Sequence, residues 1–150
     1  MRPINKDQFH HDGRGPELMR VIWSPKGDHL SAFEYFNPED PYDEEHIRHI
    51  KVIHPQVVMS TPEEVINYSS FQPGPFDKAA AFDCGRSEWL RSFAQQHLER
   101  CSHFRLMFYD ELYDIIADGL EFKMGRYKDD AQQNDTSNPH SPSAQGADGR

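Results

Sequence analysis

The chain has few basic residues, few cysteines and no long hydrophobic run. Its 150 residues include 16 Lys and Arg against 25 Asp and Glu, which gives a net charge of −9. An acidic surface repels both a phosphate backbone and an anionic bilayer. No stretch approaches the roughly 18 apolar residues of a membrane-spanning helix, and the first residues show no apolar secretory signal. The sequence therefore argues against nucleic-acid binding and against a membrane location.

Cys84 and Cys101 are the two cysteines of the chain. Without an export signal, so low a number indicates free thiols in a reducing compartment rather than a disulfide framework. We therefore expect a cytoplasmic protein.

Two common catalytic motifs are missing. No G-K-[ST] occurs, so the acids that follow the apolar run before Asp110 cannot serve a P-loop NTPase. No G-x-S-x-G occurs either, which argues against a serine hydrolase of that type. Asp110 with Glu121 and Lys123 resembles the acid and E-x-K of metal-dependent PD-(D/E)xK nucleases, but so short a pattern arises often by chance.

Aromatic residues end before the last part of the chain. After Tyr127 the sequence contains no aromatic and no β-branched apolar residue. Such a composition cannot bury enough apolar surface to offset the entropy of ordering. The sequence predicts a flexible arm at residues 1–16, one folded domain at residues 17–124 and a disordered polar tail at residues 125–150.

The first half of the domain has strand and turn signals. Leu18–Trp23 and Leu30–Phe36 are rich in β-forming residues and flank a short Pro- and Gly-containing loop, which predicts a hairpin. Residues 43–54 fit either a helix or a strand; we favour a helical turn that passes into a strand at Val57–Met59. Ser60 or Thr61, followed by Pro62 and two acids, predicts a short helix to about residue 68.

The second half alternates between helical and strand periodicity. An apolar stripe from Trp89 to Cys101, with Ser87 as its N-cap, predicts a helix. Residues 104–108 predict a strand, residues 112–116 a second short helix, and residues 120–124 another strand. These elements together predict a small single α+β domain with an N-terminal β-hairpin, a mixed sheet and two to four packed helices.

Four Cys and His residues have spacing that suggests a metal site. Twelve residues separate Cys84 from His97, three separate His97 from Cys101, and His103 follows two positions later. On a helix, His97 and Cys101 would share one face, as two zinc ligands require. The first cysteine of a zinc finger is missing, because Ala81 stands near its position, and a core Cys with a hydrogen-bonded core His explains the same residues.

The absence of a complete catalytic set favours a binding protein over an enzyme. We expect a small acidic interaction protein, such as an inhibitor, an immunity factor or an adaptor, whose partner is another protein. An acidic surface suits a basic partner. Homodimerisation is also compatible with the sequence. The alternative is a zinc-binding protein, or a metal-dependent hydrolase or nuclease, that uses Cys84, His97, Cys101 and His103 or acidic residues.

Overall fold

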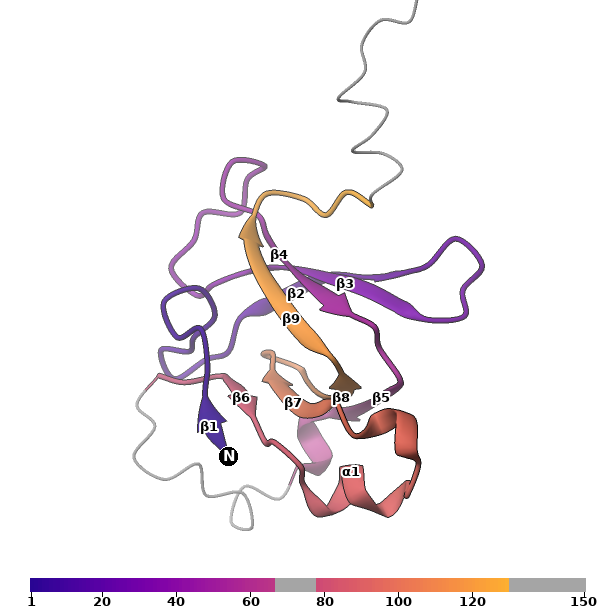
Figure 1. Cartoon of the computed structure of the whole chain (residues 1–150). Helices are drawn as coiled ribbons and strands as arrows, with labels where there is room; N and C mark the ends of the chain where they lie inside the picture. The colour runs from indigo at the N-terminus through magenta and orange to yellow at the C-terminus, as the bar shows by residue number, and fades with distance from the viewer. Residues whose placement is uncertain (67–77, 130–150) are drawn as a thin grey trace, which may run out of the picture.

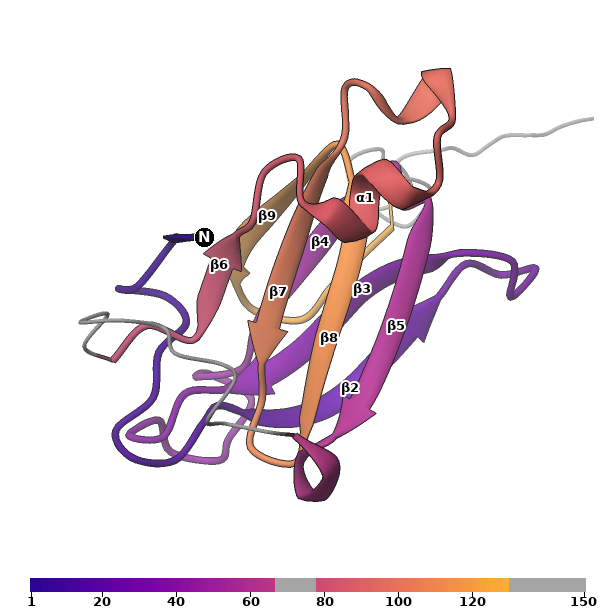
Figure 2. The same ribbon diagram turned by 90° about the horizontal axis from the view of Figure 1, so that it is seen from below.

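Two antiparallel β-sheets packed face to face make up the fold in a computed structural model (Figures 1 and 2), which describes residues 1–66 and 78–129. The five-stranded sheet has the order β1-β6-β7-β8-β5, and the four-stranded sheet has the order β2-β3-β4-β9. All pairs of neighbouring strands in both sheets are antiparallel.

The five-stranded sheet consists of β1 (Arg2–Pro3), β6 (Ala81–Asp83), β7 (Ser102–Met107), β8 (Glu111–Ala117) and β5 (Val57–Pro62). The four-stranded sheet consists of β2 (Glu17–Trp23), β3 (Leu30–Phe36), β4 (Arg48–Ile53) and β9 (Gly119–Met124). Within residues 1–66 and 78–129, helical structure is limited to α1 (Glu88–Ser92) and to two 3-10 turns, η1 (Glu63–Val65) and η2 (Gln96–Leu98).

The main core fills the space between the two sheets. Successive side chains of a strand point to opposite faces, so every second residue of each central strand reaches this space. The strand residues in this cluster are Leu30, Phe33, Tyr35, Ile50, Val52 and Phe122 from the four-stranded sheet and Ala81, Phe104, Leu106, Tyr113, Ile115 and Ala117 from the five-stranded sheet. Burial of this apolar surface is the main force that holds the sheets together.

The N-terminal segment also contributes to this core. Phe9 is fully buried, and its ring centroid lies 5.0 Å from that of Tyr35 and 5.1 Å from that of Phe108. The carbonyl of Gln8 accepts hydrogen bonds from the Tyr35 hydroxyl and from the buried Asn37 amide. Residues 1–16, predicted to be a flexible arm, therefore hold β1 and one of the most buried side chains of the protein.

A second, smaller cluster covers the outer face of the five-stranded sheet. Leu90 of α1, Leu98 of η2 and Cys101 pack on Ile116 of β8. In Figure 2, α1 lies across the near face of this sheet, over β7 and β8. The strand β8 is therefore buried on both of its faces.

The predicted α+β class is wrong, because the part of the chain that the structure describes is mostly β-structure with one short α-helix. Residues 112–116, predicted to be a helix, lie in β8. A strand that is buried on both faces carries apolar residues on both, and Leu112, Ile115 and Ile116 then imitate the spacing of a helical stripe. The prediction of a mixed sheet is also wrong, since both sheets are antiparallel.

The other helix predictions are corrected in a similar way. Residues 48–53 form β4, and the predicted helix after Ser60 is the end of β5 followed by η1. The predicted helix from Ser87 to Cys101 ends at Ser92, because Ala94 adopts a left-handed conformation with φ of 50°. Leu90, Leu98 and Cys101 of the predicted stripe are still buried, although the helix is interrupted between them, while Ala94 and His97 are exposed.

Several predictions of local structure are confirmed. β2 and β3 form the predicted hairpin, β7 and β9 occupy the predicted strand regions, and Ser87 is the N-cap of α1. Residues 67–68, the predicted end of the helix after Ser60, lie outside the described residues.

The C-terminal segment leaves β9 along the four-stranded sheet. The Tyr127 amide donates to Glu34 Oε2 at 2.9 Å, and Arg126 Nη1 donates to Glu34 Oε1 at 3.0 Å. Of the predicted disordered tail, residues 130–150 lie outside the described residues. Within residues 1–66 and 78–129, no helix is long and apolar enough to cross a membrane.

The buried ring of Phe9 leads to a prediction about stability. Phe9→Ala should lower the free energy of unfolding by about 3–5 kcal/mol, because it opens a cavity between the sheets. Met124→Ala, at a residue that is 55% exposed, is the control and should change it by less than about 0.5 kcal/mol. Urea denaturation measures both. An equally small effect of Phe9→Ala would mean that residues 1–16 are a free arm.

Candidate functional site

A chain of hydrogen bonds connects α1 to the outer face of the five-stranded sheet. Ser87 Oγ lies 2.8 Å from His103 Nδ1, and His103 Nε2 donates to Asp114 Oδ1 at 2.6 Å. His103 stands on β7 and Asp114 on β8, and both are buried. In a neutral imidazole that carries its hydrogen on Nε2, Nδ1 accepts a hydrogen bond from the Ser87 hydroxyl.

The carboxylate of Asp114, which ends this series of hydrogen bonds, also has a cationic neighbour. Arg105 Nε donates to Asp114 Oδ1 at 2.8 Å, directly across the β7–β8 ladder. Burial raises the pKa of the Asp114 carboxyl, but the hydrogen bonds from His103 and Arg105 outweigh burial, so the net pKa is lower than usual. Asp114 is therefore ionised at neutral pH.

The order serine, histidine, aspartate resembles a nucleophilic relay, but its surroundings indicate a structural role. Ser87 Oγ accepts from the Leu90 amide as the N-cap of α1. The indole of Trp89 covers His103, with ring centroids 4.8 Å apart. None of four cavities lined by described residues includes Ser87. The hydrogen bonds that join Ser87, His103 and Asp114 therefore hold α1 on the five-stranded sheet.

The four residues of the predicted zinc site lie in different environments. Cys84 follows β6, where its amide donates to the His103 carbonyl, so these two residues are neighbours in the sheet. Cys101 is in the second cluster, and its thiol donates to Asp118 Oδ1 at 3.4 Å. His97 is exposed on η2. The described part of the chain contains no group of three or more Cys, His, Asp or Glu placed to hold a metal ion.

Both cysteine thiols are poor metal ligands and nucleophiles in their protonated state. Burial raises the pKa of the Cys84 thiol and that of the Cys101 thiol, and Asp118 raises the latter further. Both cysteines are free. The zinc prediction stays a prediction.

The residues of the nuclease-like pattern are on two different sheets. Asp110 lies in the turn between β7 and β8 of the five-stranded sheet. Glu121 and Lys123 lie on β9 of the four-stranded sheet, where Lys123 Nζ is 3.5 Å from Glu121 Oε2. Because this lysine contacts its own neighbouring acid, the pattern reads as a surface ion pair of an edge strand.

The edge strand β5 differs from the other strands at the sheet edges. Its six residues, VVMSTP, carry no charge and pair with β8 in unbroken register. Among the described residues its only strand neighbour is β8. Met59 is 43% exposed on the outer face of the sheet. Only Pro62, at the end of β5, limits the pairing of a further strand.

The other three edges carry features that oppose strand addition. β1 has two residues, one of them Pro3. β2 contains Glu17 and Arg20 and has two register shifts, and β9 contains Glu121 and Lys123. Short length, charge and bulges are the usual protection of a sheet edge. Among the strands that the structure describes, β5 is thus an unprotected edge.

Acidic residues flank one end of β5. Glu63 and Glu64 follow the strand directly, and the Glu63 amide donates to the carbonyl of Asp110. Glu111 is the ladder partner of Pro62. The edge therefore joins an uncharged strand to an acidic end.

The sequence predicted a strand at Val57–Met59 but did not predict that this strand lies at the edge of a sheet. The signal in the sequence is the uncharged run VVMST, which an exposed strand rarely carries. Its meaning depends on strand order, since the same run in a central strand would be ordinary core.

Comparisons with known proteins do not add a function to this geometry. No protein-family model, curated protein or solved structure matches the chain.

The buried Asp114 should give stability a specific dependence on pH. Asp114→Asn should lower the free energy of unfolding by about 1–3 kcal/mol at neutral pH, because it weakens the bonds to His103 and Arg105. The pKa of Asp114 is lowered in the folded state, so its contribution is present above the unfolded pKa of about 3.9 and is lost as pH falls through the lower folded value.

Urea denaturation from neutral to strongly acidic pH measures this effect. The wild type and Asp114→Asn should differ at neutral pH and converge in acid. Asp12→Asn, an exposed control, should follow the wild type throughout. A gap between wild type and Asp114→Asn that did not change with pH would contradict the assigned role.

The zinc prediction has a direct measurement. If Cys84, His97, Cys101 and His103 bind zinc, untagged wild-type protein should contain about one zinc per chain and Cys101→Ser should lose it, because the site loses a ligand. Elemental mass spectrometry gives the metal content of both. No zinc in the wild type would contradict the prediction.

Proposed function

We propose that this protein has no catalytic activity of its own and works by binding another protein, whose extended segment adds to the five-stranded sheet at β5. The observation that carries the proposal is the unprotected edge, with six uncharged residues in unbroken register and one described neighbour. A strand that pairs with β5 gains backbone hydrogen bonds on a preformed template, which is a general mode of peptide recognition.

The side chains around β5 specify what the partner would offer. Val57 and Met59 point to the outer face, where Val57 packs against the second cluster, so the partner should present apolar side chains at alternate positions. Glu63 and Glu64 at the end of the strand favour a basic residue opposite them. The net charge of −9 favours a basic partner overall and would steer its approach.

A basic partner is favoured over a second copy of this chain. Two copies repel each other through their net charge, which weakens a homodimer at low salt. The free cysteines fit the cytoplasmic location that we propose for this interaction.

The edge is tested by adding one charge to it. Met59→Lys should reduce affinity for strand-forming peptides by about tenfold or more, because a lysine on an edge strand opposes further pairing. A library of random dodecapeptides is selected on the wild type with Met59→Lys as competitor. Enriched peptides should alternate β-branched residues and carry net positive charge, and isothermal titration measures their affinities.

Met19→Lys is the matched control, because Met19 is a methionine of similar exposure on the edge strand β2. It should bind the selected peptides as the wild type does. Methylation of alternate peptide backbone nitrogens should abolish binding, since it removes the donors of the added strand. Equal enrichment of peptides on the wild type and on Met59→Lys would contradict the proposed partner. The proposal would also be contradicted if the wild type formed dimers and the Met59→Lys variant did not.

A further inference from the structure

A cleft of about 520 Å³ lies where the ends of β3 and β4 meet the segment that leads into β5. Its floor is apolar and includes Leu30 and Val52, which are buried members of the main core. Its rim is formed by polar side chains from the hairpin turn, β4, the β4–β5 connection and the segment between η2 and β7. A volume of this size is in the range of small-ligand sites, which usually combine an apolar floor with a few polar groups.

The residues that line this cleft differ in charge from the protein as a whole. None of the lining residues is acidic. Four of them have side chains that carry or can gain positive charge: His29, Lys51, His54 and Arg100. Three other cavities formed by described residues each include at least one carboxylate, such as Asp110, Glu99 or Glu39. In a chain of net charge −9, a lining without carboxylates distinguishes this cleft from those three cavities.

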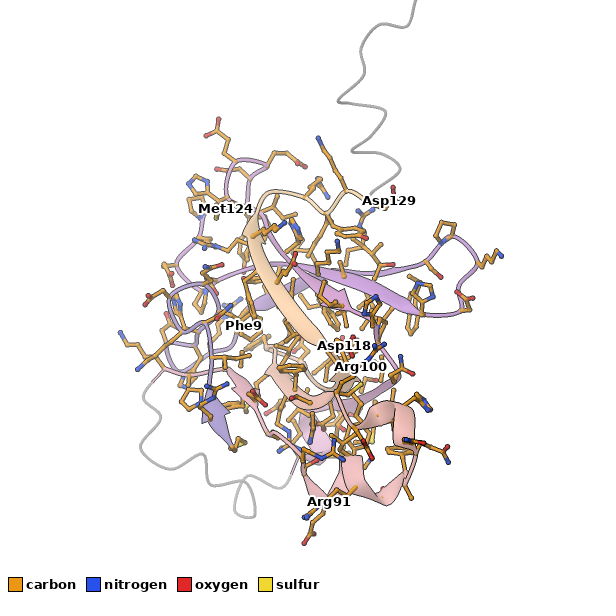
Figure 3. The ribbon with its side chains drawn as sticks, in the orientation of Figure 1. Phe9, Arg91, Arg100, Asp118, Met124 and Asp129 are labelled. Carbon is orange, nitrogen blue, oxygen red and sulfur yellow. The ribbon has the colours of Figure 1, made fainter. Side chains whose placement is uncertain are left out.

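A carboxylate beside the cleft holds two of these side chains in place. His54 Nδ1 donates to Asp118 Oδ2 at 2.8 Å, and Arg100 Nε lies 3.4 Å from Asp118 Oδ1. Figure 3 shows Arg100 and Asp118 side by side. The bond from His54 lowers the pKa of Asp118, with smaller contributions from Cys101 and Arg100, so the carboxylate stays charged. His29 is held in a similar way by Asp28 at 3.0 Å.

The backbone at His54 also serves this arrangement. His54 has φ of 49°, a left-handed conformation that is unfavourable for a residue with a side chain. Strained residues of this kind persist where the surrounding structure determines them, often at binding sites. Here the turn places the imidazole against Asp118, with its Nε2 atom not used in that bond.

We infer that this cleft binds a small organic oxyanion, a phosphate or a carboxylate attached to an apolar group. The oxyanion would lie against Arg100, His54 and Lys51, since guanidinium and ammonium groups form strong charge-assisted hydrogen bonds with such oxygens. The apolar group would lie on Leu30 and Val52, near the ring of Tyr127. This site is separate from the β5 edge and does not depend on the proposed protein partner.

The experiment uses three probes on the full chain at constant pH and ionic strength. Phenyl phosphate and benzoate share a ring and differ in the oxyanion, and inorganic phosphate lacks the ring. Amide chemical shifts in NMR titrations report where and how tightly each probe binds. We expect at least one of the two ring compounds to bind, with shifts confined to residues that line the cleft, and more tightly than inorganic phosphate.

Arg100→Gln should weaken binding of that compound by about tenfold or more, because it removes a charged hydrogen bond. Arg91→Gln is the matched control, since Arg91 is an exposed arginine of α1 that lies away from Asp118 and Arg100 in Figure 3. It changes the net charge equally and should bind as the wild type does. Asp118→Asn should also weaken binding, because His54 and Arg100 lose the group that positions them.

The pattern of binding identifies the oxyanion. Phenyl phosphate alone would indicate a phosphate ligand, and benzoate alone a carboxylate ligand. Absence of binding by both, shifts spread over the surface, or equal affinities of Arg100→Gln and Arg91→Gln would overturn the inference. Since both variants change exposed residues, their amide spectra should show the wild-type fold.

Discussion

The apolar layer between the two sheets is the constraint on which the rest of the structure depends. Neither sheet can bury its inner face alone, so each exists only because the other covers it. Phe9 belongs to this layer although it comes from the N-terminal segment and from neither sheet. The bonds of the Gln8 carbonyl to Tyr35 and Asn37 satisfy the backbone at the point where the segment enters the core.

The buried polar groups follow from the same architecture. The outer face of the five-stranded sheet lies partly under α1, so polar residues on that face must find partners there. Asp114 accepts hydrogen bonds from His103 and Arg105, and His103 is also hydrogen-bonded to the N-cap Ser87. On the four-stranded sheet, the fully buried Glu34 is paired with Arg20 and Arg126. Both networks attach a covering segment to a sheet face.

The proposed functions use what this architecture leaves open. Every sheet that does not close into a barrel has two edges, and three of the four described edges are short, charged or bulged. β5 is the exception. The residues beyond its two ends also differ, with Glu63 and Glu64 after Pro62 and the cleft lined by His54 and Arg100 before Val57. Both proposals thus concern one side of the molecule, but through different contacts: backbone hydrogen bonds in one case and side-chain charges in the other.

Local patterns in the sequence were sufficient for some elements and misleading for others. The hairpin of β2 and β3 follows from turn residues between two β-rich runs, and the N-cap at Ser87 from one hydroxyl before an apolar stripe. The same kind of reasoning took β8 for a helix, because a helical stripe and a strand buried on two faces can share one spacing of apolar residues. The predicted contact of His97 with Cys101 depended on a helix that ends at Ser92.

The sequence by itself determined the acidic charge, several strands and several local turns, because these depend on composition and short-range spacing. Only the tertiary structure decided that β5 is an edge, that Ser87, His103 and Asp114 meet, and that four dispersed basic residues line one cleft. These properties require strand order and long-range pairing. Such pairing depends on the burial of whole faces against each other, which no single segment encodes.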